Sequence, residues 1–307
     1  MNDGELPYIT VIITAYDRKR FLLKAIQSAV EQTLTKKNYE IIVIKNFTEN
    51  TIDGFINQYN IKNILMDGTI GEFLYAGVSI SAGEVISFLD DDDLFSKEKL
   101  AILYNTFKAN INLCYFHNSS IFINDEYQKL NLPIADSIAF NMSSITVRKS
   151  ILKLENLSKL DFAPDEYMYL SALDSTKSFI ATREQLTYRI VNNGIAHINT
   201  DNIDEFIRSK QTINERIIKN FKIFSEIFIS NEANKYINYS ITLAEFSSYI
   251  YGKNVKPKNI FNIFKNNGMG FYDKLAIFFA YILVRVHYNF RYIIIKKLLA
   301  NKQNIKI

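Results

Sequence analysis

Residues 85–95 read VISFLDDDDLF, an apolar run that ends in four consecutive aspartates, Asp90 to Asp93. A short continuous apolar run is typical of a strand buried in a parallel sheet. The aspartates then fall at the carboxyl end of that strand, where open α/β sheets bind their ligands. Clustered carboxylates repel one another, and a hard divalent cation with open positions for phosphate oxygens relieves that repulsion. The run therefore predicts a metal and diphosphate site, unless it is a solvated acidic turn that caps a helix near residues 96–98.

Apolar runs and helical patterns alternate around this strand, which indicates a parallel sheet covered by helices. Apolar side chains recur at helical spacing over residues 21–30 and predict the first helix. The expected strands are residues 8–14, 40–44, 61–66 and 85–89. Four strands within about ninety residues indicate a nucleotide-binding half of Rossmann type.

The pattern changes twice further along the chain. It is mixed between residues 101 and 200, where we expect strands at 112–123 and 144–147 and a helix at 165–173. From residue 201 onward it is helical in period, and the expected helices are 204–229, 231–251, 257–265 and 272–299. We predict an α/β domain over residues 1–200, followed by a helical C-terminal region over 201–307.

Composition excludes several classes of function. The net charge is only +4, with 36 basic and 32 acidic residues, so nucleic acid is not an expected partner. The single cysteine, Cys114, allows no intrachain disulfide and fits a reducing compartment. The N-terminus lacks a secretory signal pattern, and the apolar run 275–284 is shorter than the roughly 20 residues that span a bilayer. We therefore expect a cytoplasmic protein, with the inner face of the membrane as an alternative location.

Several motifs occur together in the first hundred residues. They are Ile12-Ile13-Thr14-Ala15-Tyr16-Asp17-Arg18, the segment 25–33 that ends in Gln32-Thr33, the strand 40–44, and the segment 81–93 that leads into the acidic run. In this order they resemble the inverting glycosyltransferases of family 2, which have the GT-A fold. The resemblance implies a GT-A domain with a Rossmann-like nucleotide-binding sheet, a mixed acceptor half, and an Asp-x-Asp metal site.

The resemblance also implies roles for individual residues at the donor site. Asp92 would bind Mn²⁺ or Mg²⁺ with Asp90 as its partner in the Asp-x-Asp pair, while Asp90 or Asp91 would hold the donor ribose or orient the metal's waters. Thr14 and Tyr16 match positions that cradle the nucleoside.

Two of these loop residues have alternative roles. The Tyr16 ring either stacks on the base or packs within the protein. Asp17 either contacts the donor or caps the helix that follows.

Two departures from the family pattern concern the donor. The chain has Lys45-Asn46-Phe47-Thr48 where the family usually has Asp-Asp-Gly-Ser. Asn46 could still accept a hydrogen bond from a uracil ring nitrogen through its amide oxygen, without the charge of a carboxylate. Lys45 would either approach a phosphate or be a solvated loop lysine. Ala76-Gly77 replaces an Arg-Asn pair that often helps to position the donor.

An inverting transfer needs a base that takes the proton of the acceptor hydroxyl. Asp165 and Glu166, after Pro164, resemble the family's acidic dyad with its order reversed. Glu166 matches the usual base by position, Asp165 is the alternative, and both could instead serve the start of a helix. His197 follows a segment that resembles the one before a late histidine of the metal or phosphate site.

The C-terminal segment 272–299 combines bulky apolar residues with basic ones and has no acidic residue after Asp273. A basic amphipathic helix of this kind can lie on an anionic membrane surface. The alternative is a helix that packs on the catalytic domain or on a second subunit of a homo-oligomer.

We therefore predict a metal-dependent inverting glycosyltransferase. It would move a sugar from a nucleoside diphosphate-sugar to a hydroxyl of a glycan or lipid-linked acceptor. The alternatives are a non-catalytic descendant that binds a nucleotide or a protein partner, and a nucleotidyltransferase, which would release pyrophosphate.

Overall fold

The computed structural model describes residues 6–130, 141–175, 177–190, 202–252, 261, 263–264, 270–286, 291 and 293–298. The chain divides into two compact units, Met1–Asn193 and Gly194–Ile307.

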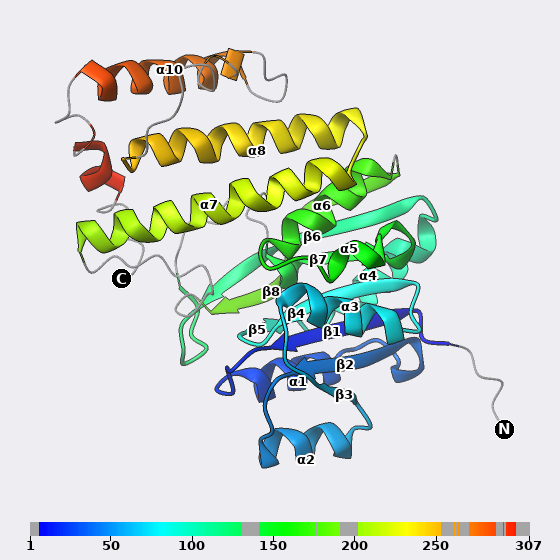
Figure 1. Ribbon diagram of the computed structural model, residues 1–307. Coiled ribbons are helices and arrows are strands. Elements are labelled where there is room, and N and C mark those ends of the chain that lie inside the picture. The colour runs from blue at the N-terminus through cyan, green and yellow to red at the C-terminus, as the bar shows by residue number, and fades with distance from the viewer. Residues whose placement is uncertain are drawn as a thin grey trace. The chain divides into compact units, whose positions relative to one another are not determined.

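The described part of the first unit is built on an eight-stranded sheet with strand order β3-β2-β1-β4-β7-β6-β8-β5 (Figure 1). The strands are β1 Ile9–Ala15, β2 Tyr39–Lys45, β3 Lys62–Leu65, β4 Val85–Asp90, β5 Asp93–Phe95, β6 Leu113–Ile123, β7 Ile145–Arg148 and β8 Ser178–Ile190. Strands β1 to β4 are parallel, while β7 runs antiparallel to both β4 and β6. The sheet is thus parallel in its first half and mixed in its second, as predicted.

The central strands form because their apolar runs can be buried on both faces. Alternate residues of β1, among them Val11 and Ile13, pack in a core cluster with apolar side chains of helices α1, α2 and α4. Ile12 points to the other face, where it meets helix α3 at Gly77. The helices of this unit are α1 Leu22–Val30, α2 Asn50–Gln58, α3 Ile70–Ile80, α4 Lys99–Ala109, α5 Leu154–Leu157 and α6 Pro164–Asp174.

Gly77 explains one departure from the family pattern. A Cβ added at Gly77 would lie 2.9 Å from Ile44 Cδ1 and 3.1 Å from Ile12 Cγ2. A larger residue such as the family's asparagine would require the Ile44 and Ile12 side chains to shift, because α3 packs directly on β1 and β2.

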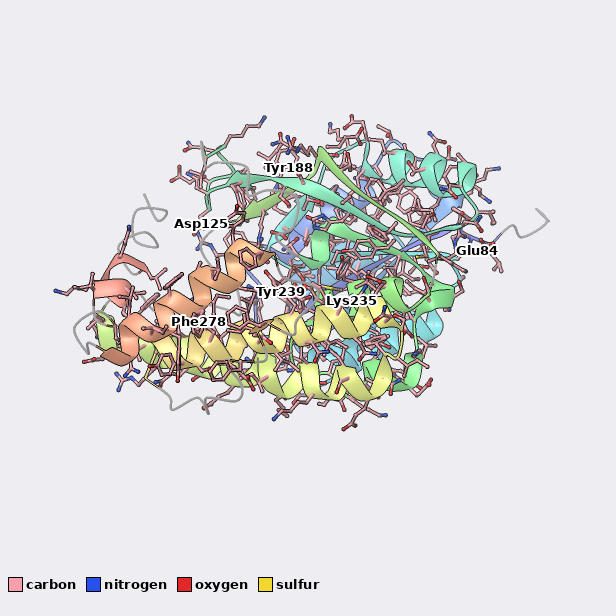
Figure 2. The ribbon with its side chains drawn as sticks, turned by 90° about the horizontal axis from the view of Figure 1, so that it is seen from above. Glu84, Asp125, Tyr188, Lys235, Tyr239 and Phe278 are labelled. Atoms are coloured by element: carbon pink, nitrogen blue, oxygen red, sulfur yellow. The ribbon has the colours of Figure 1, made fainter. Side chains whose placement is uncertain are left out.

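Two strands were not predicted. Strand β5 contains Asp93, the last residue of the acidic run, and pairs antiparallel with β8. Neither strand has a clear sequence signal, because β5 is only three residues long and most of the first eight residues of β8 are polar or exposed. Tyr188 of β8, labelled in Figure 2, packs with Leu94 of β5 against the small cluster of Phe21, Ile123 and Ile190.

The described part of the second unit is helical, as predicted, with α7 Ile203–Ile227, α8 Asn231–Ile250 and α10 Phe271–Val286. Figure 1 shows α8 between α7 and α10. The side chains of Asn202 and Ser230 cap α7 and α8 by accepting hydrogen bonds from the Glu205 and Ala233 amides. Tyr239 of α8 and Phe278 of α10, both labelled in Figure 2, pack against the unit's own apolar cluster.

The predicted helix 272–299 is described in part. Helix α10 is described over Phe271–Val286 and residues 293–298 are helical, whereas 287–290, 292, 299 and most of the predicted helix 257–265 lie outside the described residues. None of the helices in the described ranges has the length and apolar character that a membrane crossing requires.

Candidate active site

The carboxyl ends of β2, β1 and β4 bring the predicted donor residues to one edge of the sheet. In the strand register, Thr14 lies opposite Ile44 of β2 and Asp90 of β4. The next residues of each strand therefore leave the sheet side by side. These are Tyr16 to Arg18 after β1, Asn46 after β2, and Asp91 to Asp93 after β4.

Asp17 and Asn46 form a reciprocal pair. The Asp17 amide donates to Asn46 Oδ1 at 2.8 Å, and Asn46 Nδ2 donates to Asp17 Oδ1 at 2.9 Å. The pair holds Asp17 in the left-handed region, with φ of 56°. Helix α1 begins at Leu22 with no side-chain cap, so Asp17 does not cap it. The amide oxygen expected to read the base thus has one protein donor already and keeps capacity for a second.

The Tyr16 side chain is 49% exposed, and its ring lies 6.1 Å from that of Phe73. The charge of Asp67, followed by that of Asp17, raises the pKa of the Tyr16 hydroxyl. The ring is therefore accessible at the edge of the sheet, beside the Asp17–Asn46 pair.

Lys45 is neither a phosphate ligand nor a solvated loop residue in this structure, contrary to both alternatives above. It is fully buried at the end of β2 and forms an ion pair with Asp53 of α2 at 2.8 Å. Its Nζ also donates to the Phe47 carbonyl at 2.7 Å. Lys45 therefore secures the loop that carries Asn46.

The acidic run is largely below the surface, with Asp91, Asp92 and Asp93 all buried. Burial, followed by the charges of the other three aspartates, raises the pKa of Asp90 well above its usual value. Burial also raises the pKa of Asp91 to about 7, against the effect of Arg18, and that of Asp93 to about 6. The run is thus a concentration of negative charge that the protein only partly compensates.

Two residues from the 3-10 turn before β7 hold the run from one side. Asn141 Nδ2 donates to Asp93 at 3.1 Å and to Asp90 at 3.5 Å. The Asp90 amide donates to Ser143 Oγ at 2.9 Å. Strand β5 follows at once, and helix α4 begins without a side-chain cap, so the acidic run does not cap that helix.

Lys99 lies beneath the run and is fully buried. Its Nζ donates to the Ser143 carbonyl and, at 3.3 Å, to Thr187 Oγ1 of β8. Burial lowers the pKa of Lys99 to about 7, and the charge of Asp93 opposes that shift. Lys99 therefore ties α4 to the turn and to the strand that frame the acidic residues.

The predicted acidic dyad lies at the start of α6. Asp165 and Glu166 are in its first turn, after Ala163 in the left-handed region and Pro164. Asp165 Oδ1 accepts from the Glu166 amide at 3.0 Å, and burial raises the pKa of Asp165. Glu166 is partly exposed.

A tyrosine and an arginine accompany these acids. The Tyr115 hydroxyl is buried and has no hydrogen-bond partner among the described residues, and burial and then the charge of Asp165 are the largest causes of its strongly raised pKa. Arg189 lies opposite Asp93 in the β5–β8 pair. Burial raises the pKa values of Asp90, Asp93 and Asp165, and the charge of Arg189 opposes that rise in all three. Arg189 therefore lies close to both the acidic run and the dyad.

Most of the predicted site residues are thus gathered in one unit, while His197 lies outside the described residues. Sequence reasoning assigned no role to the residues that contact them, namely Arg18, Lys99, Tyr115, Asn141, Ser143 and Arg189. Arg18 lies within the quoted motif of residues 12–18, and Arg189 lies in the segment before His197, so these positions were the available signal. The others follow no pattern that could have identified them.

The model of the family described as "Glycosyl transferase family 2" matches residues 10–164. This range is half of the chain and includes β1, the acidic run and the start of α6. The chain belongs to glycosyl transferase family 2. The resemblance inferred from the motifs is confirmed.

Curated relatives of this family 2 chain are distant. It is 29% identical over 110 residues to a poly(ribitol-phosphate) β-glucosyltransferase of Bacillus spizizenii, which covers 33% of this chain and only 17% of the relative. It is 24% identical over 189 residues to the poly(ribitol-phosphate) β-N-acetylglucosaminyltransferase TarP of Staphylococcus aureus, with 59% of this chain and 52% of TarP covered. An uncharacterized glycosyltransferase of Haemophilus influenzae is 25% identical over 70% of this chain and 81% of its own length.

Solved structures share the fold. TarS of S. aureus, residues 1–349 in complex with UDP-GlcNAc, has a TM-score of 0.53 and 15% identity, over 79% of this chain and 72% of that one. The mannosyltransferase PcManGT of Pyrobaculum calidifontis, in complex with GDP-Man and Mn²⁺, has a TM-score of 0.53 and 13% identity. The match covers 96% of this chain and 86% of that chain. The predicted GT-A fold with an added helical region is confirmed.

Proposed function

We propose that this chain is a metal-dependent inverting glycosyltransferase. It transfers a sugar from a nucleoside diphosphate-sugar to a hydroxyl group of a glycan or a lipid-linked acceptor. The observation that carries the proposal is the set of aspartates at the carboxyl edge of the sheet, next to Thr14, Tyr16 and Asn46. An acidic site beside an accessible aromatic ring suits a nucleoside diphosphate held through a cation.

The donor set fits a divalent cation in part. Asp90 and Asp92 offer hard oxygen ligands. Burial and then the neighbouring negative charges raise the pKa of Asp90, and a cation would relieve the repulsion among those charges. No group of three acidic, histidine or cysteine side chains converges on one point within the described ranges. The remaining ligands of Mn²⁺ or Mg²⁺ would therefore be phosphate oxygens and water, which favours binding of metal and donor together.

Each step assigns a task to the chain's own residues. Tyr16 stacks on the base, Thr14 and Asn46 line its edge, and Asp91 supports the site through Arg18 instead of reaching the ribose. A bound cation would neutralise charge that develops on the diphosphate leaving group. Glu166 takes the proton of the acceptor hydroxyl as that oxygen attacks the anomeric carbon. We assign this task to Glu166 because it matches the family's base by position, and because Asp165 Oδ1 already accepts a hydrogen bond from the Glu166 amide.

The nucleoside base of the donor can be identified by measuring ligand binding. The solved relatives hold UDP-GlcNAc and GDP-Man, so uridine and guanosine donors are both candidates. Thermal shift with UDP- and GDP-sugars in the presence of Mn²⁺ selects the donor, because a ligand that binds the native state raises its melting temperature. Release of nucleoside diphosphate from that donor then tests turnover, and release of pyrophosphate would instead indicate a nucleotidyltransferase.

The decisive variant is Asp92→Asn. We expect it to fold and to lose at least about a hundredfold of metal-dependent turnover, as expected for loss of one group that stabilises transition-state charge. Asp125→Asn is the matched control, because Asp125 is an aspartate that pairs with the exposed Arg20 and is not one of the predicted donor-site residues. Undiminished turnover in Asp92→Asn would rule out this metal site.

One observation favours the non-catalytic alternative. Arg18 occupies Asp91 and Asp92 with its own positive charge. A protein in which that arginine replaced the metal permanently would bind nucleotides equally well with and without Mn²⁺ and would turn over no donor. Calorimetry with nucleoside diphosphates in both conditions separates the two functions.

We further propose that the helical region brings the enzyme to its acceptor at an anionic membrane surface. Helix α10 packs on α8 through Tyr281, whose ring lies 4.8 Å from that of Tyr249. Tyr272, Phe279 and Leu283 are 83%, 58% and 45% exposed and recur at helical spacing. Lys296 and Lys297, also exposed, supply positive charge. The alternative occupant of this face is a second copy of the chain.

A further inference from the structure

Arg18 joins two carboxylates of the acidic run, and it engages them unequally. Its Nε donates to Asp91 Oδ2 at 3.0 Å, and its Nη2 donates to the other oxygen of the same carboxylate. Its Nη1 donates to Asp92 Oδ2 at 2.7 Å. Asp91 thus forms a bidentate pair with the guanidinium, whereas Asp92 receives a single hydrogen bond from it.

The three groups form a charge cluster in which both carboxylates are largely buried. The side chains of Asp91 and Asp92 are 2% and 12% exposed, and that of Arg18 is 32% exposed. Ionised carboxylates at this depth are costly unless a positive charge pairs with them. Arg18 comes from the loop after β1, 73 residues from Asp91 in the sequence, so it is part of the folded site and not a local ion pair.

We propose that Arg18 is the resident counter-cation of the acidic run in the metal-free protein, and that it releases Asp92 but keeps Asp91 when a divalent cation binds. This inference rests on the proposed function, because it takes Asp92 as a metal ligand. The bidentate pair with Asp91 uses two of the guanidinium donors and keeps Arg18 in place. Of these two pairs, the single hydrogen bond to Asp92 is the one that has to be exchanged.

The exchange has a measurable consequence for metal affinity. A cation that takes Asp92 Oδ2 must displace a charge-assisted hydrogen bond and must approach a fixed positive charge. Arg18 therefore weakens metal binding to the free protein, and it protects the acidic run from uncompensated charge while metal and donor are absent. Arg18 acts on the metal through Asp92 and is a positioning residue.

The test is Arg18→Gln, with Mn²⁺ alone as the probe. Free Mn²⁺ is measured by electron paramagnetic resonance during titration, and melting temperature is measured in chelator and in Mn²⁺. We expect the variant to melt lower than the wild type in chelator and to recover in Mn²⁺. We also expect it to bind Mn²⁺ roughly tenfold more tightly, as loss of one competing charge-assisted hydrogen bond predicts.

Arg20→Gln is the matched control. Arg20 lies two residues away, is 67% exposed, and pairs with Asp125 at 2.9 Å at the surface. It should bind Mn²⁺ as the wild type does. If Arg18→Gln fails to fold, Arg18→Lys replaces it, because lysine keeps the charge but cannot bridge two carboxylates in this way. Arg18→Lys should bind Mn²⁺ more tightly than the wild type, by a smaller factor.

Two results would overturn the inference, and they are distinguishable from a failure of the proposed function. If the wild type binds Mn²⁺ through Asp92, and Arg18→Gln or Arg18→Lys binds it equally or more weakly, then Arg18 prearranges the carboxylates and does not compete with the metal. If neither the wild type nor the variant binds Mn²⁺, either alone or with UDP or GDP present, the metal site itself is absent, and the proposed function fails with it.

Discussion

At the scale of single residues, the Asp17–Asn46 pair shows how this chain departs from its family without losing the loop geometry. The second loop has an amide where relatives usually have a carboxylate, and that amide both accepts from and donates to Asp17. An aspartate at position 46 could accept from the Asp17 amide but could not donate to the Asp17 carboxylate. The identity of residue 46 is therefore tied to that of residue 17.

Restoring the family's carboxylate alone should be harmful. We expect Asn46→Asp to lower the free energy of unfolding by about 1 kcal/mol, because it removes one hydrogen bond and places two carboxylates together at a partly exposed site. The double variant Asp17→Asn/Asn46→Asp exchanges donor and acceptor and should recover most of that loss. Urea denaturation of the wild type, of Asp17→Asn, of Asn46→Asp and of the double variant measures the coupling energy between the two residues. Additive effects of the two substitutions would show that the pair is not an energetic unit.

The crowded acidic run predicts a pH dependence in the metal-free protein. The pKa of Asp90 is raised in the folded state, so folding takes up a proton above the ordinary carboxyl pKa, and stability is lost as pH rises through that window. Asn resembles the protonated form and has no such loss. In chelator, the melting temperature of Asp90→Asn relative to the wild type should therefore rise as the pH increases above the ordinary carboxyl pKa of about 4.

Mn²⁺ provides the control for this pH effect. It should raise the wild-type melting temperature at neutral pH and have little effect on Asp90→Asn, which lacks a metal ligand. A difference between the two proteins that stays constant with pH in chelator would contradict the crowding of Asp90.

At the scale of elements, α10 has one apolar face that is buried and another apolar face that is exposed. Ile277 and Val284 are buried with Tyr281 in the second unit's core, whereas Phe279, Ile282 and Leu283 are exposed. A soluble helix with both faces apolar usually has a partner for each face. The proposed partner of the exposed face is an anionic membrane surface.

The double variant Phe279→Glu/Leu283→Glu tests that partner. We expect its sedimentation with phosphatidylglycerol vesicles to weaken at least about tenfold, since each buried apolar side chain contributes roughly 1.5–3 kcal/mol. Ile229→Glu is the control, because Ile229 is 81% exposed but lies in the short connection between α7 and α8. Unchanged sedimentation would exclude this face. Loss of a dimer in light scattering, with vesicle binding unaffected, would assign the face to a second copy.

At the scale of the whole molecule, the two units have separate apolar cores. The main cluster of the first unit extends from Tyr8 to Leu186, and the cluster of the second unit extends from Phe206 to Ile295. Apart from His197, the predicted donor residues belong to the first unit. We therefore assign donor chemistry to the domain predicted over residues 1–200 and acceptor or membrane contact to residues 201–307.

A chain that ends at Asn193 should reveal this division. We expect it to fold and to keep the Mn²⁺-dependent thermal shift caused by its nucleotide, because Asp90, Asp92 and the nucleotide-binding residues are retained and His197 is the one predicted site residue that is removed. Transfer to a membrane-bound acceptor should fall sharply. Loss of the nucleotide-induced shift in a folded fragment would show that the second unit completes the donor site.

The sequence alone determined the parallel half of the sheet, the position of the acidic run at its carboxyl edge, and the family. Continuous apolar runs and ordered motifs are properties of neighbouring residues, so they can be read without coordinates. Only the tertiary structure decided how the charges are compensated. Lys45 pairs with Asp53, Arg18 with Asp91, and Asn141 with Asp93. The last two contacts join residues 73 and 48 positions apart, and only the packing of the strands and loops between them determines which groups meet.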